Sequence, residues 1–200
     1  TADDATRYRD AAEVEAAWAK EPVKRLRQFM AEQGWWDEHQ EQALLAEASR
    51  EVDRAVASGD LARVERSLAD MKDKFGGTQY AHQAALLAAK ALQVKDKSEA
   101  ARAALKWVAE VAPDPAYRDI ARLRLSALLL DAGSHDEALA QLTAPFTPAM
   151  AGLSADLRGD VLHAKGQKTE AAAAYQTAWQ QLVDSADYRR LVEAKLNAMG

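Results

Sequence analysis

Histidine offers the most versatile chemistry in this chain, because imidazole can bind metals and transfer protons near neutral pH. A zinc site built from histidines needs its ligands at short, regular spacings. The four histidines are instead far apart and fall on different predicted helices: His39, His82, His135 and His163. We therefore expect solvated or partly buried histidines and no metal site.

Carboxylates are the second group that could carry chemistry. Asp3 and Asp4 are adjacent, but they stand in a polar N-terminal stretch that would keep both of them solvated. No serine, histidine and aspartate follow a pattern typical of a catalytic triad. The chain has no cysteine, which excludes disulfides, thiolate catalysis and cysteine metal ligands. The sequence predicts no catalytic residue and no cofactor.

Arg158, Gly159 and Asp160 spell a tripeptide found in cell-adhesion ligands. Here the tripeptide falls inside a predicted helix, where the extended turn of an adhesion ligand cannot form. Gly159 also has a packing role, which is described below. We expect this tripeptide to be part of a helix and not an adhesion site.

Composition limits the class of protein. The 200 residues carry a formal net charge of −5, include only 9 glycines and 5 prolines, and are rich in helix formers such as alanine. A net negative charge argues against binding nucleic acid by neutralising phosphates. No apolar run approaches the ~20 residues of a membrane span. These features predict an all-α protein with no membrane span in this chain and no nucleic-acid partner.

Proline, glycine and capping residues divide the chain into helices. They bound two N-terminal helices over 10–20 and 22–34 and a long amphipathic helix over 37–59. Trp35 and Trp36 could anchor a partner, but a plug between N-terminal helices is the favoured interpretation. The same signals predict helices over 61–75, 79–96, 99–112, 116–133, 135–143, 155–166, 167–184 and 186–200.

Small and aromatic residues recur at fixed spacings near the C-terminus. Gly159 on one predicted helix is followed by Ala171, Tyr175 and Ala178 on the next. A small residue on one helix lets a second helix approach closely, and an aromatic side chain fills the space between hairpins. Two of these positions recur one repeat length earlier, and a weaker copy precedes that one. The predicted packing residues are Gly159, Ala171, Tyr175, Ala178, Ala138, Leu142, Ala101 and Leu105.

These spacings resemble the tetratricopeptide repeat, a helix hairpin of about 34 residues. Four segments resemble, in order, the periplasmic repeat domain of the ancillary SecYEG translocon subunit family: ARVERSLADMKDKFGGTQYAHQAALLAAKAL, YRDIARLRLSALLLDAG, ADLRGDVLHAKGQKTEAAAAYQTA and YRRLVEAKLNAMG. The resemblance implies an irregular tetratricopeptide-like stack, an α-solenoid, over residues 59–200. It also implies a non-catalytic protein-interaction module at the periplasmic face of the bacterial inner membrane. The implied partners are translocon subunits, periplasmic chaperones and emerging secretory clients.

The first 50 residues resemble a different family. The segments DDATRYR, EPVKRLRQF and QGWWDEHQEQAL are similar to the C-terminal tail of the alpha subunit of thiamine-diphosphate 2-oxo acid dehydrogenases, the pyruvate and branched-chain types. In that family the loop matching Asp3, Asp4, Tyr8 and Arg9 lies near the active-site entrance. The chain has no GDG motif for a metal-diphosphate site, so the resemblance implies a tail and no enzyme. Together the two resemblances indicate a chimera, with an N-terminal helical segment over 1–58.

Two other functions compete with the interaction module. One is a cytoplasmic dehydrogenase fragment, active only with thiamine diphosphate, Mg²⁺ and a beta subunit, and the other is a stable fold without a partner. If the stack has a binding groove, the first helix of each pair should line it. Helix phase then favours Gln83, Lys90, Arg122, Arg124 and His163 as partner-binding residues. Charge reversal at the two arginines is expected to weaken binding to an acidic partner.

Overall fold

The computed structural model describes residues 32, 34, 37–95, 97–182 and 185–199. It divides the chain into two units, Thr1–Glu47 and Ala48–Gly200, and the division falls within a helix. Several predictions lie outside the described residues: the helix over 10–20, all but two residues of the helix over 22–34, the tryptophan pair at 35–36 and the loop with Asp3, Asp4, Tyr8 and Arg9.

Every regular element in the described part of the chain is a helix, and the predicted all-α fold class is confirmed. The longest helix, α3, begins with a reciprocal cap in which the Gln40 N–H donates to Asp37 and the Asp37 N–H donates to Gln40. The helices are α3 (Glu38–Ser58), α4 (Leu61–Phe75), α5 (Gln79–Val94), α6 (Ser98–Val111), α7 (Pro115–Asp131), α8 (His135–Gln141), α9 (Pro148–Ala164), α10 (Lys168–Gln181) and α11 (Ala186–Asn197).

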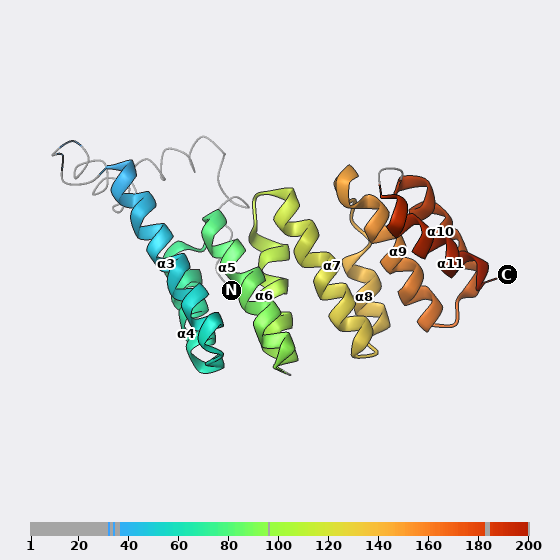
Figure 1. Ribbon diagram of the computed structural model, residues 1–200, viewed down its shortest axis with the longest axis horizontal. Helices are drawn as coiled ribbons and strands as arrows, with labels where there is room; N and C mark the ends of the chain where they lie inside the picture. The colour runs from blue at the N-terminus through green and yellow to red at the C-terminus, as the bar shows by residue number, and fades with distance from the viewer. Residues whose placement is uncertain (1–31, 33, 35–36, 96, 183–184, 200) are drawn as a thin grey trace, which may run out of the picture. The chain divides into compact units, whose positions relative to one another are not determined.

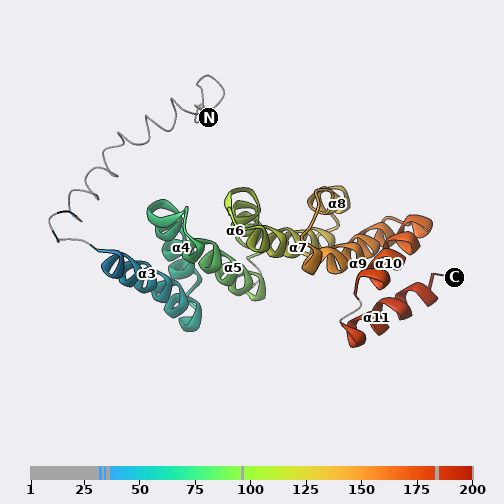
Figure 2. The same ribbon diagram turned by 90° about the horizontal axis from the view of Figure 1, so that it is seen from above.

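Within the unit Ala48–Gly200, helices α4 to α10 follow one another in chain order, and each packs on the next (Figure 1). Helix α8 has only 7 residues, so α7 also reaches α9. The last helix, α11, packs on α10 (Figure 2). Successive packing of helices along the chain is the arrangement expected of a repeat stack.

Two apolar cores hold this unit together. The larger one runs from α3 to α9 and includes Met71, Leu92, Leu105 and Val108, all nearly inaccessible to solvent. The smaller one joins α9, α10 and α11. In that smaller core α11 contributes a single fully buried side chain, Val192. The two ends of the unit therefore differ in how much apolar surface they bury.

The repeat recurs in the turns that close α7 and α9. Gly133 and Gly166 lie one repeat length apart in the sequence and have φ angles of 75° and 78°. After each of them, the next N–H donates to the carbonyl five residues back: Ser134 to Leu129 at 2.8 Å, and Gln167 to Leu162 at 2.9 Å. This is the Schellman arrangement, which favours glycine because of the positive φ.

Helix α9 begins at Pro148, seven residues earlier than the predicted start at 155. Pro148 lies between the two helices predicted over 135–143 and 155–166, but it occupies the first turn of α9. Proline fits there because the first turn leaves its N–H groups without helical partners. The buried Asp119 accepts a hydrogen bond from the Thr147 N–H at 2.8 Å and so fixes this start.

Candidate protein-binding groove

A groove of about 420 Å³ lies along α9 and α10. We call it the α9–α10 groove. Residues of α9 and α10 at helical spacing line it, together with Leu142 and Phe146 from the α8–α9 connection. Its lining consists of Leu142, Phe146, Ala151, Ser154, Ala155, Arg158, Leu162, Glu170, Ala173, Ala174, Thr177 and Gln181.

Seven of the twelve lining residues are apolar, and four of these seven are alanines. The five polar residues include one cation, Arg158, and one anion, Glu170. An apolar concavity with a few polar groups suits the docking of a peptide or helix, because apolar contact supplies affinity and polar groups supply orientation. None of the lining residues is a histidine, and the lining contains no pair of carboxylates suited to acid–base chemistry.

Glycines on α9 allow α10 to approach closely enough to form this groove. A Cβ atom at Gly159 would lie 2.4 Å from two ring carbons of Tyr175, and one at Gly152 would lie 2.7 Å from Leu182. Such distances are shorter than any van der Waals contact. All eight residues predicted to pack the repeats are buried: Gly159, Ala171, Tyr175, Ala178, Ala138, Leu142, Ala101 and Leu105.

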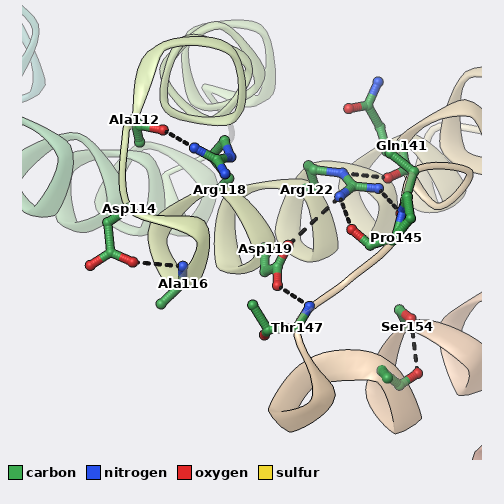
Figure 3. A network of polar contacts seen from close by, with 12 residues as sticks. Ala112, Asp114, Ala116, Arg118, Asp119, Arg122, Gln141, Pro145, Thr147 and Ser154 are labelled. Atoms are coloured by element: carbon green, nitrogen blue, oxygen red, sulfur yellow. Dashed lines mark hydrogen bonds and ion pairs between the residues drawn. The ribbon is translucent and has the colours of Figure 1, made fainter.

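Arg122 holds the segment that carries Phe146. Its guanidinium donates to the carbonyl of Gln141, the last residue of α8, at 2.8 Å and to two carbonyls of the α8–α9 connection, Ala144 at 2.6 Å and Pro145 at 3.2 Å (Figure 3). It also stacks 4.0 Å from the centre of the Phe146 ring. Helix phase predicted that Arg122 contacts a partner protein. In the structure its guanidinium N–H groups instead donate to backbone carbonyls of the same chain. Arg122 therefore positions Phe146.

The Asp119 carboxylate completes this support. It lies 3.6 Å from the Arg122 guanidinium, and both side chains are largely buried. Burial lowers the pKa of Arg122 from its ordinary value, and the charge of Asp119 opposes that change. The same carboxylate accepts the Thr147 N–H, so a single residue of α7 orients the arginine and also satisfies the backbone N–H of the residue that precedes α9 (Figure 3).

The other predicted partner-binding residues lie outside the α9–α10 groove. Arg124 is exposed and donates to the Leu86 carbonyl of α5 at 3.3 Å. Gln83 and Lys90 are exposed on α5, and Lys90 lines a different pocket. His163 is exposed in the last turn of α9 and is not part of the α9–α10 groove. Helix phase located exposed positions, but not the groove.

An ionic cluster that the sequence analysis missed joins α9, α10 and α11. The Lys195 ammonium lies 2.9 Å from Asp156 and 2.7 Å from Asp160. The hydroxyl of Tyr188 donates to Asp156 at 2.7 Å, and that of Tyr175 donates to Asp160 at 2.8 Å. Asp160 belongs to the adhesion-like tripeptide, which lies within α9. The spacing of Asp156 and Asp160, one helical turn apart, could have suggested a charged cluster, but nothing in the sequence indicates that Lys195 is their partner.

The environment of this ionic cluster changes the pKa of three of its members. Burial alone would lower the pKa of Lys195, but its hydrogen bonds to Asp160 and Asp156 raise it above the ordinary value. Burial and the hydrogen bonds to carboxylates raise the pKa of Tyr175 and Tyr188. At neutral pH the lysine is therefore charged and both tyrosines are protonated, as a structural link requires.

His82 is the histidine whose surroundings differ most from the expectation. Its side chain is completely buried, and in the described part of the chain neither ring nitrogen makes a hydrogen bond of normal geometry. The centre of its ring lies 5.4 Å from the ring centre of Trp107 and 6.3 Å from that of Tyr117. Burial lowers its pKa and so favours the neutral form. Within the described residues, no three side chains of the kinds that ligate metals lie together.

Comparison with known proteins places this geometry in a family. The family described as tetratricopeptide repeat-like domain matches residues 23–200. The chain belongs to this family. Proteins of this family mediate protein interactions, and the match indicates a non-enzymatic repeat protein. None of the helices in the described ranges combines the length and the apolar character needed to cross a membrane.

The ancillary SecYEG translocon subunit of Neisseria gonorrhoeae is 27% identical to the chain over 160 residues, which are 80% of this chain and 77% of that protein. The alpha subunits of mitochondrial 2-oxoisovalerate dehydrogenase from Mus musculus and Homo sapiens are each 44% identical over 62 residues. That match covers 30% of this chain and 14% of each dehydrogenase subunit. Both predicted resemblances are thus confirmed. No solved structure matches the chain significantly.

Proposed function

We propose that this protein is a non-catalytic interaction module that docks a segment of a partner protein in the α9–α10 groove. The observation that carries the proposal is a concavity of about 420 Å³ with seven apolar and five polar lining residues, one of which, Phe146, is held by Arg122. Three hydrogen bonds from Arg122 fix the segment that carries Phe146 and so pre-organise this part of the lining, which reduces the ordering cost of binding.

A substitution that fills the groove tests this site. Ala173 is exposed and lines the groove, so Ala173→Trp should fill it without disturbing the core. We expect partner affinity to fall at least about tenfold. Ala103→Trp, at an exposed position of α6, is the matched control. Equal affinities for both variants and the unmodified chain would exclude the groove as the docking site.

The similarity to the translocon subunit supports a more specific role. We infer that the protein works beside the SecYEG translocon at the periplasmic face of the inner membrane. Its partners there would be translocon subunits, periplasmic chaperones and emerging secretory clients. The family match and a relative aligned over 77% of its length support this role.

Affinity capture from detergent-solubilised bacterial envelope tests the specific role. The tagged full chain should retain translocon or chaperone subunits, the Ala103→Trp variant should retain them equally, and Ala173→Trp should lose them. A helical, folded chain that retains no specific protein would favour a fold without an evolved partner.

A second candidate function rests on the 44% identity to dehydrogenase alpha subunits. The chain would then be a C-terminal dehydrogenase fragment fused to a repeat domain and inactive alone. Its signature would be association with the dehydrogenase beta subunit. Gel filtration of the full chain mixed with that subunit tests this alternative, and separate elution would exclude it. An assay with thiamine diphosphate and Mg²⁺ should give no 2-oxo acid decarboxylation.

A further inference from the structure

A second concavity lies at the other end of the repeat unit, and its chemistry differs from that of the α9–α10 groove. It has a volume of about 300 Å³ and is formed by α5 together with the end of α3 and the start of α4. We call it the α5 pocket. Its lining consists of Val56, Gly59, Leu61, Val64, Leu87, Lys90, Ala91, Val94 and Lys95.

We propose that the α5 pocket is a second docking surface, which takes an acidic amphipathic segment of a partner protein. An apolar side chain of that segment enters the pocket, and carboxylates on either side of it pair with Lys90 and Lys95. This surface is separate from the α9–α10 groove and does not depend on the function proposed for that groove.

Exposed apolar surface is the first observation that supports a docking role. Val94 is 75% exposed at the end of α5, the highest value among the large exposed hydrophobic side chains of the described residues. Leu87, Ala91 and Val94 follow one another at helical spacing, so they form one apolar face of α5. A contiguous apolar face rimmed by charges is typical of interaction sites.

The charge of the rim is the second observation. Lys90 and Lys95 line the pocket, and no acidic residue among the described ones does. Among the described residues, neither lysine has a carboxylate within ion-pair distance, whereas Lys74, Lys106 and Lys165 each have one. Asp60, which stands beside the lining residues in sequence, is engaged as the cap of α4.

The helix dipole does not account for this arrangement. Lysine is favoured at the C-terminal end of a helix, which explains Lys95. Lys90 lies a full turn earlier, and the dipole gives no reason for a valine to be exposed between the two lysines. In a chain with a net charge of −5, two cations without an ion-pair partner among the described residues are complementary, around an apolar pocket, to an acidic, apolar ligand.

The concave shape favours a peptide over a lipid surface. A pocket of about 300 Å³ has room for one or two side chains. A membrane surface is instead bound by apolar groups that protrude and by several cations acting together. The α5 pocket has only two cations and is concave, so we propose that its ligand is a peptide.

Fluorescence anisotropy with two designed peptides tests the proposal on the full chain. The first peptide is an amphipathic helix of about 18 residues with leucine on one face and glutamate on both flanks. The second peptide has lysine in place of each glutamate. We expect the glutamate peptide to bind and the lysine peptide to bind at least about tenfold more weakly.

Three variants locate the binding. Lys90→Glu/Lys95→Glu and Val94→Asp change exposed positions and should each weaken binding of the glutamate peptide at least about tenfold. Lys106→Glu/Lys168→Glu makes the same charge change at exposed positions away from the pocket and should leave binding unchanged. Ala173→Trp should also leave it unchanged, which separates this site from the α9–α10 groove.

Three results would overturn the proposal: no binding of the glutamate peptide, equal binding of both peptides, or undiminished binding by the two pocket variants. Binding of the chain to vesicles of phosphatidylcholine with about one-third phosphatidylglycerol is measured as a further test. If those vesicles bind through Val94 and the two lysines while the glutamate peptide does not, the surface binds anionic lipid and the peptide assignment is wrong.

Discussion

Helices α4 to α7 and helices α9 to α11 are held together by different kinds of contact. The first group packs through an apolar core in which Leu105, Val108 and Leu92 are almost completely buried. The only buried polar side chain of α5 is His82, whose ring lies close to those of Trp107 and Tyr117. In the second group, α11 adds Val192 to a small core and is further held by the ionic cluster around Lys195.

Because of this difference, substitutions in the two groups of helices should change the free energy of unfolding in different ways. An apolar core loses free energy in proportion to the volume removed. A buried ionic cluster depends on all of its members, because one missing charge leaves its partners desolvated and unpaired. The C-terminal end of the unit should therefore tolerate a coordinated change better than a single one.

The largest effect is expected from Lys195→Met. Asp156 is 2% exposed, so loss of the lysine leaves a buried carboxylate without its counter-charge. We expect unfolding free energy to fall by about 4 kcal/mol, measured by urea denaturation. Adding Asp156→Asn and Asp160→Asn should recover part of the loss. Lys106→Met, at an exposed pair with Glu110, should cost less than about 0.5 kcal/mol. A small effect of Lys195→Met would mean that α11 is not held by charge.

A somewhat smaller effect is expected from Leu105→Ala in the apolar region. Leu105 is 2% exposed, and its truncation should cost about 3 kcal/mol because a cavity remains. Leu191→Ala makes the same chemical change at a position that is 51% exposed on α11, and should cost less than about 0.5 kcal/mol. Differential scanning calorimetry of both variants would measure the contrast. Similar losses would contradict the burial of Leu105 in the larger core.

The smallest effect concerns pH and His82. Because burial lowers its pKa in the folded state, the unfolded chain binds more protons. Stability should therefore fall as the pH drops below about 6.5, the ordinary pKa of histidine. Urea titrations between about pH 7.5 and about pH 5.5 should show a smaller loss for His82→Leu than for the unmodified chain. Parallel losses would show that another group governs acid stability.

Much of the fold follows from local sequence signals. Glycines at 133 and 166 mark turns with the same hydrogen bonds, and Gly159 stands where the ring of Tyr175 approaches. These turns and this close packing depend on residues that are near one another in the sequence or separated by one repeat hairpin. The spacing of glycines and aromatic residues is therefore enough to predict them. The start of α9 was not predictable in this way, because Asp119, 28 residues earlier in the chain, accepts the N–H that fixes it.

The candidate site was harder to predict than the fold. Helix phase indicates which face of α7 carries Arg122, but not that the connection after α8 folds back over it. The same limit hid the ionic cluster, since Lys195 lies 39 residues from Asp156 and 35 from Asp160. The partner of a charge depends on how distant segments meet, and a single sequence carries little information on this.

The matched turns at Gly133 and Gly166 have a consequence for how such a chain can grow. The segment 134–166 begins after one Schellman turn and ends in another of the same geometry. A tandem copy of this segment would therefore be joined on both sides by a turn that the chain already forms. Duplication of the gene segment that encodes these residues could therefore lengthen the stack by one repeat without requiring a new type of turn.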